Sequence, residues 1–400
     1  MRSHPVPAPL LLESADPRSP LTWLRGSDGI VGSGVAVRLE FSGPDRIAEA
    51  ARAWRALAGQ AEVRDEVGIP GSGLVAFGTF AFGDTSPATS VLVIPRVIVG
   101  RRAGIAWRTE IAPAPEGAPS PAPLGAAPRL RFAAGRMSPD GYRAAVAEAV
   151  RRIERGVFAK AVLARDLDAR IPRSSDVRPV LARLADGYPD CWTFAVDGLV
   201  GSSPETLVRV DGGAVSARVL AGSAPRGASR ASDTESVTEL LASAKDRDEH
   251  RFAVRSVLAG LRGHTTALHA SDAPFPLELP NVWHLASDVT GRLADGSSSL
   301  DLVAALHPTA AVAGSPTGAA LAAIAELEPF DRGRYAGPVG WTDAAGNGEW
   351  AVALRCAQVT PDGRVTAYAG AGIVAGSEPE QELAETELKF APILGAFGQL

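Results

Sequence analysis

A lysine in an apolar stretch is the first residue whose surroundings could change its chemistry. Lys160 lies in FAKAVLARDLDA (158–169), a predicted strand in which Phe158, Val162 and Ala164 share the face of the lysine. An amine among such side chains would lose hydration, and a lysine kept neutral in this way can act as a general base. The alternative is a lysine at a strand edge whose long stem reaches water.

A glutamate at a turn is the second candidate for proton transfer. Glu205 follows a Ser-Pro turn in GSSPETLVRV (201–210), at the expected start of another strand. A carboxylic acid held in that place could protonate a departing hydroxyl group. The alternative is a turn carboxylate in water, because acids are seldom buried. The local sequence leaves both interpretations open.

Two charged helices could supply ligands for a divalent cation. Glu249 belongs to SAKDRDEHR (243–251), where charges fall on every face of a predicted helix. In QELAETELK (381–389), Glu382, Glu385 and Lys389 stand at i, i+3 and i+7 and share one face. Carboxylates on two helices, with water completing the shell, are typical of a Mg²⁺ site. The alternative is an ordinary helix surface with ion pairs.

An arginine interrupts an apolar segment near the C-terminus. Arg355 lies within WAVALRCAQV (350–359), which predicts a strand. A guanidinium group inside such a strand must find an anion, and its fork suits a carboxylate. That anion could be a substrate carboxylate or a buried acid of the protein itself.

Several familiar motifs are absent or incomplete. The glycines of GAGIVAG (370–376) are spaced G-x-G-x-x-x-G, which is not the dinucleotide-binding pattern. The six histidines form no H-x-x-x-H pair, which argues against a catalytic zinc site. The chain also has no G-x-S-x-G motif and no P-loop.

Composition limits the class of protein. The net charge is −5 with no dense block of basic residues, so nothing favours nucleic-acid binding. No uninterrupted apolar run of about 18 residues predicts a membrane span, and the first twenty residues do not look like a secretory signal. Cys191 and Cys356 are the only cysteines and cannot form a disulfide framework. We expect a cytoplasmic, monomeric protein with a small-molecule substrate.

Hydrophobic periodicity predicts a mainly antiparallel α+β architecture. We treat residues 1–400 as one domain, with a more variable portion at 1–130, a Pro/Ala-rich loop at 112–128 and a catalytic core at 131–400. A capping box at SDTE (232–235) predicts the start of one long helix that reaches Leu261. The other expected elements are strands at 35–41, 73–83, 91–111, 158–169, 191–196, 199–219, 336–342, 349–359 and 364–370 and helices at 45–60, 138–155, 317–326 and 378–397.

A series of ordered motifs resembles the chorismate-binding family, which includes isochorismate, salicylate, anthranilate and aminodeoxychorismate synthases. The resemblance runs from about residue 137 to the C-terminus and is looser before it, where AFGTFAFG (76–83) carries it. The motifs are KAVLAR (160–165), GSSPETL (201–207), LAGSAPRG (220–227), SAKDRDEH (243–250), VWHLAS (282–287), LHPTAAVAGSP (306–316), AELEPFDRGRYAGPVGW (325–341), GNGEWAVALRCA (346–357), AGAGIV (369–374) and AETELK (384–389).

The resemblance implies a fold and a set of roles. The fold is two large antiparallel sheets packed face to face, surrounded by helices, as in anthranilate synthase component I. Lys160 is similar to the base that activates water for attack at ring C2 of chorismate, and Glu205 to the acid that protonates the departing C4 hydroxyl. Glu249 and Glu385, with Glu382 nearby, resemble Mg²⁺ ligands. The implied substrate-binding residues are Gly222, Ser223, His284, His307, Arg355, Gly370 and Lys389.

Two features favour an isochorismate synthase within this family. Anthranilate synthases usually have glutamine in place of Lys160, and HPT (307–309) is similar to isochorismate synthases. A salicylate synthase, which also eliminates pyruvate, and a non-catalytic chorismate-binding protein are the alternatives. Ala224 stands where many members have arginine, and Ala244 stands where some relatives have glutamate. The sequence leaves open whether the product serves menaquinone or siderophore biosynthesis.

Overall fold

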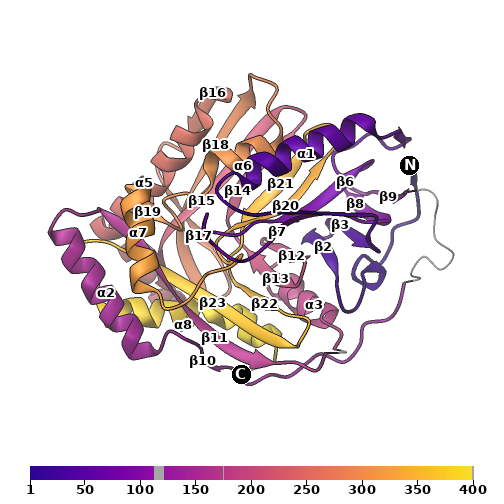
Figure 1. Ribbon diagram of the computed structural model, residues 1–400. Coiled ribbons are helices and arrows are strands. Elements are labelled where there is room, and N and C mark those ends of the chain that lie inside the picture. Colours follow the sequence, from indigo (N-terminus) through magenta and orange to yellow (C-terminus); the bar gives the residue numbers. More distant parts are fainter. Residues whose placement is uncertain (112–120, 174, 399–400) are drawn as a thin grey trace.

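The computed structural model describes residues 1–111, 121–173 and 175–398, and within them two β-sheets carry the architecture (Figure 1). One sheet has 13 strands and the other has 10, and every pairing except β1 with β5 is antiparallel. The predicted α+β fold with two antiparallel sheets is therefore confirmed. Of the predicted loop at 112–128, residues 112–120 lie outside the described residues, and residues 121–128 contain no helix or strand.

The two sheets each combine segments from distant parts of the chain. The larger sheet runs β10 (Ala133–Ala134), β11 (Lys160–Arg170), β23 (Arg364–Ile373), β22 (Cys356–Val359), β13 (Leu199–Ser203), β12 (Trp192–Val196), β2 (Leu21–Arg25), β3 (Asp28–Ser33), β8 (Val97–Arg102), β9 (Ile105–Glu110), β1 (Arg2–Pro5) and β5 (Arg64–Asp65), with β19 (Gly314–Ser315) beside β11. The smaller sheet runs β16 (Thr265–Ala270), β18 (Val282–Leu293), β15 (Ala214–Pro225), β14 (Thr206–Asp211), β21 (Gly348–Val352), β20 (Pro338–Asp343), β6 (Val75–Thr79), β7 (Ser90–Ile94) and β4 (Val37–Phe41), with β17 (Phe275–Glu278) beside β18. Strands that precede residue 111 thus belong to both sheets.

The chain crosses from one sheet to the other at two adjacent corners. Strand β13 leads into β14 through Pro204 and Glu205, while β21 leads into β22 through residues 353–355. Because β13 pairs with β22 and β14 pairs with β21, the two corners lie side by side. The backbone N–H of Val352 donates to the Glu205 carbonyl at 3.2 Å, and the N–H of Ser202 donates to the Arg355 carbonyl at 3.2 Å.

The single strand predicted at 349–359 is therefore wrong. It is two strands in different sheets, and Arg355 lies between them with a φ of 48°. A left-handed backbone at this residue breaks the pleat and turns the chain toward the second sheet. Arg355 accordingly stands at a corner and not inside a strand.

The helices cover the sheets, and α2, α5 and α7 lie on the side of the molecule away from β8 and β9 (Figure 1). Their bounds are α1 (Arg46–Gln60), α2 (Pro139–Glu154), α3 (Arg178–Gly187), α4 (Arg230–Ala242), α5 (Ala244–Leu261), α6 (Ser299–Leu306), α7 (Thr317–Leu327) and α8 (Pro379–Ala396), with a short 3₁₀ helix at Leu12–Ser14. No helix among the described residues is long and apolar enough to cross a membrane.

The long helix predicted from 232 to 261 is also wrong. The chain forms α4 and α5 instead, and the capping box uses Ser229 and Ser232. Ser243 has an extended backbone, and its side chain accepts the N–H of Asp246 at 3.2 Å, which starts a new helix. This restart sets the direction of α5, which carries Glu249.

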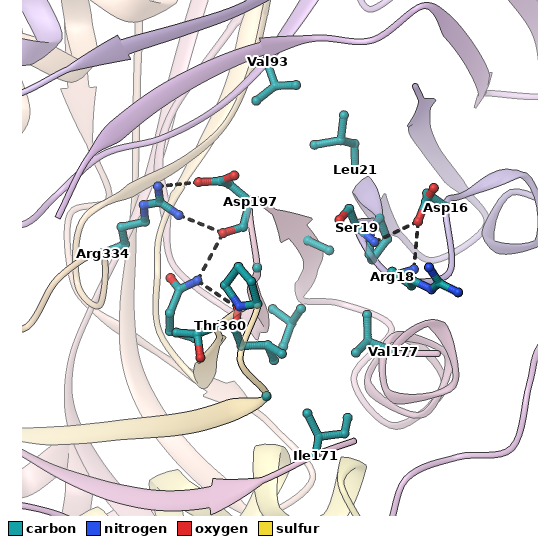
Figure 2. A pocket seen from close by; sticks show the side chains of 18 of the residues that line it. Asp16, Arg18, Ser19, Leu21, Val93, Ile171, Val177, Asp197, Arg334 and Thr360 are labelled. Atoms are coloured by element: carbon teal, nitrogen blue, oxygen red, sulfur yellow. Dashed lines mark hydrogen bonds and ion pairs between the residues drawn. The ribbon is translucent and has the colours of Figure 1, made fainter. Parts of the chain in front are cut away.

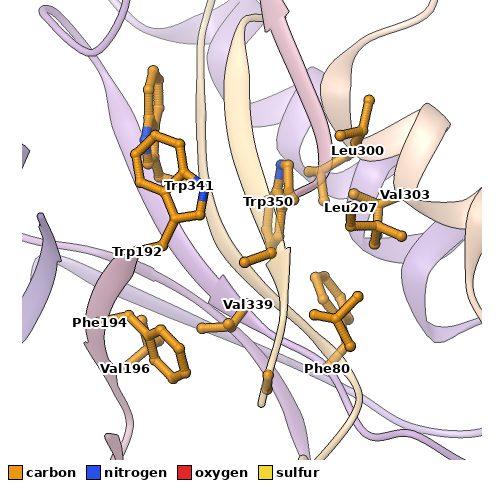
Figure 3. Close-up of a cluster of buried hydrophobic side chains, with 14 of the residues drawn as sticks. Phe80, Trp192, Phe194, Val196, Leu207, Leu300, Val303, Val339, Trp341 and Trp350 are labelled. Atoms are coloured by element: carbon orange, nitrogen blue, oxygen red, sulfur yellow. The ribbon is translucent and has the colours of Figure 1, made fainter. Parts of the chain in front are cut away.

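The main hydrophobic core lies between the sheets and under α1, α5 and α6. Figure 3 shows Trp350 with Phe80, Leu207, Leu300 and Val303 on one side and with Trp341 on the other. The rings of Trp350 and Phe80 are 5.7 Å apart, and both side chains are fully buried. Burial of such large apolar side chains makes the two sheets a rigid support for the corners.

Candidate functional site

A small cavity of about 50 Å³ lies where the corners meet the ends of several strands. It brings together most of the residues singled out in the sequence. These are Glu205, Gly222, Ser223, Glu249, His284, Arg355, Gly370 and also Lys389 from α8. Its remaining wall is formed largely by Val162, Leu220, Ala311, Val312, Arg332 and Tyr335.

Glu205 is buried in this cavity, in surroundings that favour its protonated form. Its side chain comes from the corner between β13 and β14, and only 5% of the residue is exposed. Burial raises the pKa of the Glu205 carboxyl to about 8, although the positive charges of Lys160, Arg355 and Lys389 oppose the shift. The alternative of a turn carboxylate in water can be set aside, and the acid interpretation fits its environment.

Lys160 is completely buried and paired with Glu249. It begins β11, so it stands at the start of the strand and not in its middle. Its Nζ lies 3.1 Å from Oε1 of Glu249 on α5. A Cβ at Gly372 would lie 2.0 Å from that oxygen and 3.0 Å from Cε of Lys160, so only glycine leaves room for the pair. The structure therefore excludes the solvent-reaching lysine.

Arg355 is held in place by a histidine. Its Nη2 donates to Nε2 of His284 at 2.9 Å, and the other ring nitrogen, Nδ1, lies 3.3 Å from the Gly222 carbonyl. Burial, and then the charge of Arg355, lower the pKa of His284 to about 3. The imidazole is therefore neutral, accepts from Arg355 and donates to Gly222. The guanidinium group of Arg355 therefore faces the cavity with its positive charge uncompensated by His284, because the imidazole is neutral.

Helix α8 supplies Lys389 to the wall of the cavity and Glu385 beside it. Lys389 pairs with Glu385, and its Nζ also donates to the Gly370 carbonyl at 2.9 Å. Although burial opposes it, Lys389 holds the pKa of Glu385 below its usual range. Glu382 is 1% exposed, and burial together with the charge of Glu385 raises its pKa to about 7.

Lys245 is a residue of this region that the sequence interpretation missed. Its Nζ lies 2.6 Å from Oε1 of Glu382, joining α5 to α8. The signal that could have found it is compositional, because the chain contains only three lysines and the other two are Lys160 and Lys389.

His307 is the one predicted substrate contact that does not line the small cavity. Its Nε2 lies 3.0 Å from the Phe82 carbonyl, and its ring meets the Phe82 ring edge-on at 5.8 Å. Burial lowers the pKa of His307 to about 4, so it is a neutral side chain near neutral pH. The contact with Phe82 ties the segment before α7 to the N-terminal part of the chain.

The carboxylates near α5 and α8 suit a hard divalent cation by their chemistry. Among the described residues, no three histidine, cysteine or carboxylate side chains gather closely enough to hold a metal as they stand. Glu249 and Glu385 are each engaged by a lysine, and Oε2 of Glu382 is buried with no hydrogen-bond partner. Oxygen donors of this kind are those that Mg²⁺ prefers.

A much larger cavity of about 810 Å³ lies on the other side of Arg332 and Tyr335, which line both cavities. Figure 2 shows Asp197 and Arg334 on one side of it and Asp16, Ser19 and Val177 on the other. Its acids already have partners: Asp197 accepts from Arg38 and Arg334, and Asp16 accepts the backbone N–H groups of residues 18 and 19. Size alone would select this cavity, but Glu205 lines the smaller one. Lys160 does not line it and lies beside it through its contact with Glu249.

Comparison with known proteins identifies the family of this chain. The model of the family described as chorismate binding enzyme matches residues 120–398. This chain belongs to the chorismate-binding enzyme family. Isochorismate synthase DhbC of Bacillus subtilis is 42% identical over 272 residues, which cover 65% of this chain and 68% of the relative. Putative isochorismate synthase MenF of Mycobacterium tuberculosis is 41% identical over 291 residues, which cover 69% and 78%.

Solved structures show the same fold over nearly the whole chain of this family member. A putative 2,3-dihydroxybenzoate-specific isochorismate synthase, DhbC of Bacillus anthracis, is 32% identical and superimposes with a TM-score of 0.81 over 97% of this chain and 98% of its own. MenF, the menaquinone-specific isochorismate synthase of Escherichia coli, is 26% identical, with a TM-score of 0.78 over 99% and 94%. Anthranilate synthase component I of Streptococcus pneumoniae, 22% identical with a TM-score of 0.74 over 92% of each chain, shows the fold alone.

Proposed function

We propose that this protein is an isochorismate synthase that converts chorismate to isochorismate. The observation that carries the proposal is the buried, protonated Glu205 in one small cavity with the guanidinium of Arg355, beside the pair of Lys160 and Glu249. Two relatives that share more than 40% identity are named an isochorismate synthase and a putative isochorismate synthase, which supports the same reaction.

The reaction adds water at ring C2 and removes the hydroxyl at C4, so it needs a base and an acid. Lys160 acts as the neutral amine, after its ammonium group has given a proton to solvent. It then accepts a proton of the attacking water, and Glu205 protonates the departing hydroxyl. The two side chains start from different places, the first strand position of β11 and the corner after β13. Such a separation lets them act on different atoms of one ring.

The substrate carries two carboxylates, and the site offers cations for them. Arg355, oriented by His284, presents a guanidinium group that suits a carboxylate. Lys389 lies at the Gly370 carbonyl, on the part of the wall formed by β23 and α8. Gly222 and Gly370 line the cavity with backbone, and a Cβ at either position would collide with Asp246 or with the Leu163 carbonyl oxygen.

A Mg²⁺ ion completes the proposed site. Glu249 and Glu385 would hold it, with Glu382 as a further acidic residue, and the bound ion would supply positive charge to a substrate carboxylate. The lysines that neutralise these acids must then release them. Without the ion, Lys160 and Lys389 compensate the negative charges of Glu249 and Glu385 and so reduce the free-energy cost of burying them.

Incubation of the purified protein with chorismate and Mg²⁺, followed by chromatography of the products, tests the proposal. Isochorismate without pyruvate is the expected result. Release of pyruvate and fluorescent salicylate would identify a salicylate synthase, and binding without turnover would identify a non-catalytic chorismate-binding protein. Neighbouring genes for quinone or for siderophore biosynthesis would assign the pathway. We also propose that the protein is cytoplasmic and monomeric. Size-exclusion chromatography tests the oligomeric state.

A further inference from the structure

Lysine is rare in this chain, and all three of its lysines contact the glutamates of α5 and α8. Of 40 basic residues, 37 are arginines and only Lys160, Lys245 and Lys389 are lysines. Arginine therefore serves every other cationic position of the protein. Each of the three lysines forms an ion pair with a glutamate of α5 or α8, namely Glu249, Glu382 and Glu385. Lys160 and Lys389 belong to the site already described, whereas Lys245 has no assigned role.

The protein can hold a buried glutamate with arginine, and it does so elsewhere. Glu328 is 6% exposed and is held by Arg332, whose Nε lies 2.9 Å from Oε2 and whose Nη2 lies 2.6 Å from Oε1. The guanidinium fork thus occupies both carboxylate oxygens, as its planar shape favours. Both oxygens of Glu328 are thus engaged, and Oε1 also accepts the backbone N–H of Ala164 at 2.8 Å.

Lysine holds Glu382 differently. The Lys245 ammonium lies 2.6 Å from Oε1 alone, while Oε2 is buried and has no hydrogen-bond partner. The Ser377 side chain lies near enough to lower the pKa of Glu382, yet Oε2 has no hydrogen-bond partner. A compact ammonium group compensates the charge of the carboxylate through one oxygen and leaves the second oxygen available. An unpartnered carboxylate oxygen is costly inside a protein, so a site for a further cation is the natural explanation.

The position of Lys245 connects it with the proposed metal carboxylates. Lys245 and Glu249 are one turn apart on α5, and Glu382 and Glu385 are one turn apart on α8. Burial lowers the pKa of Lys245, but Glu382, then Glu385 and Glu249, outweigh this effect and raise it overall. All three glutamates are therefore close enough to act on its charge.

We propose that Lys245 is a positioning residue that grips one oxygen of Glu382 and keeps the other directed at a divalent cation held between α5 and α8. The inference rests on the Mg²⁺ site of the proposed function. It adds a reason for lysine at this position, because arginine would cover both oxygens.

Titration of the full-length protein with Mg²⁺ by isothermal calorimetry, without substrate, tests this role. We expect Lys245→Met to weaken Mg²⁺ binding about tenfold, as loss of a residue that orients a metal ligand commonly does. Lys245→Arg should weaken it at least as much, although the charge is retained. Glu382→Gln, which removes the gripped carboxylate, should give a similar loss. Thermal unfolding of each variant checks that the fold is intact.

The matched control is Arg143→Met, which breaks another ion pair to α8. The Nε of Arg143 lies 2.7 Å from Oε1 of Glu380, away from the small cavity. This variant should bind Mg²⁺ like the wild type. Unchanged or tighter binding by Lys245→Met, or full affinity in Lys245→Arg, would overturn the role of Lys245 alone. A wild-type protein that binds no Mg²⁺ would instead overturn the metal site of the proposed function.

Discussion

The small and the large cavity share a wall but differ in the charge state of their buried carboxyl groups. In the cavity of about 810 Å³, the carboxylate of Asp197 is clamped by Arg38 and Arg334. In the cavity of about 50 Å³, burial raises the pKa of Glu205 to about 8 and leaves it protonated. A large volume alone does not identify a functional site. A titratable group with a strongly shifted pKa is the better indication of where catalysis can occur. Substitutions in the small cavity should change kcat or KM, whereas substitutions in the large cavity should change at most the free energy of unfolding.

Removal of the proposed base should give the largest effect. Lys160→Ala deletes the amine that would take the proton of water, and we expect kcat to fall by about 10³-fold or more. Steady-state turnover of chorismate to isochorismate measures this change, and circular dichroism checks that the variant is folded. Near-normal rates would show that Lys160 is not the base.

Loss of the guanidinium group in the small cavity should impair binding of the substrate. Arg355→Gln removes a charged hydrogen-bond donor that His284 holds in place, so we expect KM for chorismate to rise by roughly 30-fold. The matched variant Arg38→Gln alters an arginine of the large cavity and should leave KM within about twofold of the wild type. Equal changes in KM would erase the distinction between the cavities.

The pH dependence of turnover should report the acid in the small cavity. Because the pKa of Glu205 is raised to about 8, the carboxyl keeps its proton at neutral pH and loses it as the pH rises further. The proton donor then disappears, so kcat should fall above pH 8 by roughly tenfold per pH unit. A rate profile from pH 6 to 10, with thermal unfolding at each pH, tests this. A rate that stays constant from pH 8 to 10 in the folded protein would contradict an acid role.

The ion pairs of the large cavity should matter for stability and not for catalysis. Burial opposes ionisation of Asp197, but Arg38 and then Arg334 hold its pKa below the usual range. Asp197→Asn weakens both contacts, and we expect the free energy of unfolding to fall by about 1–3 kcal/mol with kcat unchanged. Urea denaturation measures the first quantity. A large loss of kcat in a folded variant would place the large cavity in the reaction.

Filling the large cavity should have the smallest effect. Ser19 is exposed on its rim, and Ser19→Trp would occupy part of the space shown in Figure 2. We expect kcat and KM to stay within about twofold of the wild type, since surface substitutions seldom perturb distant sites. A tenfold loss of turnover would show that the large cavity serves the reaction, for example as a passage for the substrate.

The sequence predicts the fold class and most of the candidate site. Alternating apolar residues predict the antiparallel strands, and residue type and context single out Lys160, Glu205 and Arg355. The sequence misses Lys245, because a lysine in a charged helix looks like a surface residue until its partner Glu382 is seen to be buried. The sequence also gives no reason to expect contact between His307 and Phe82, which is 225 residues earlier in the chain.

By itself, then, the sequence determined which side chains could act as acid, base and metal ligand, and that two antiparallel sheets would support them. Only the tertiary structure decided that the chain changes sheets at Glu205 and again at Arg355. Local periodicity cannot reveal such a change, because a strand looks the same whichever sheet it joins. Pairing between β13 and β22 and between β14 and β21 sets the two corners side by side, and that pairing joins segments about 150 residues apart along an antiparallel ladder.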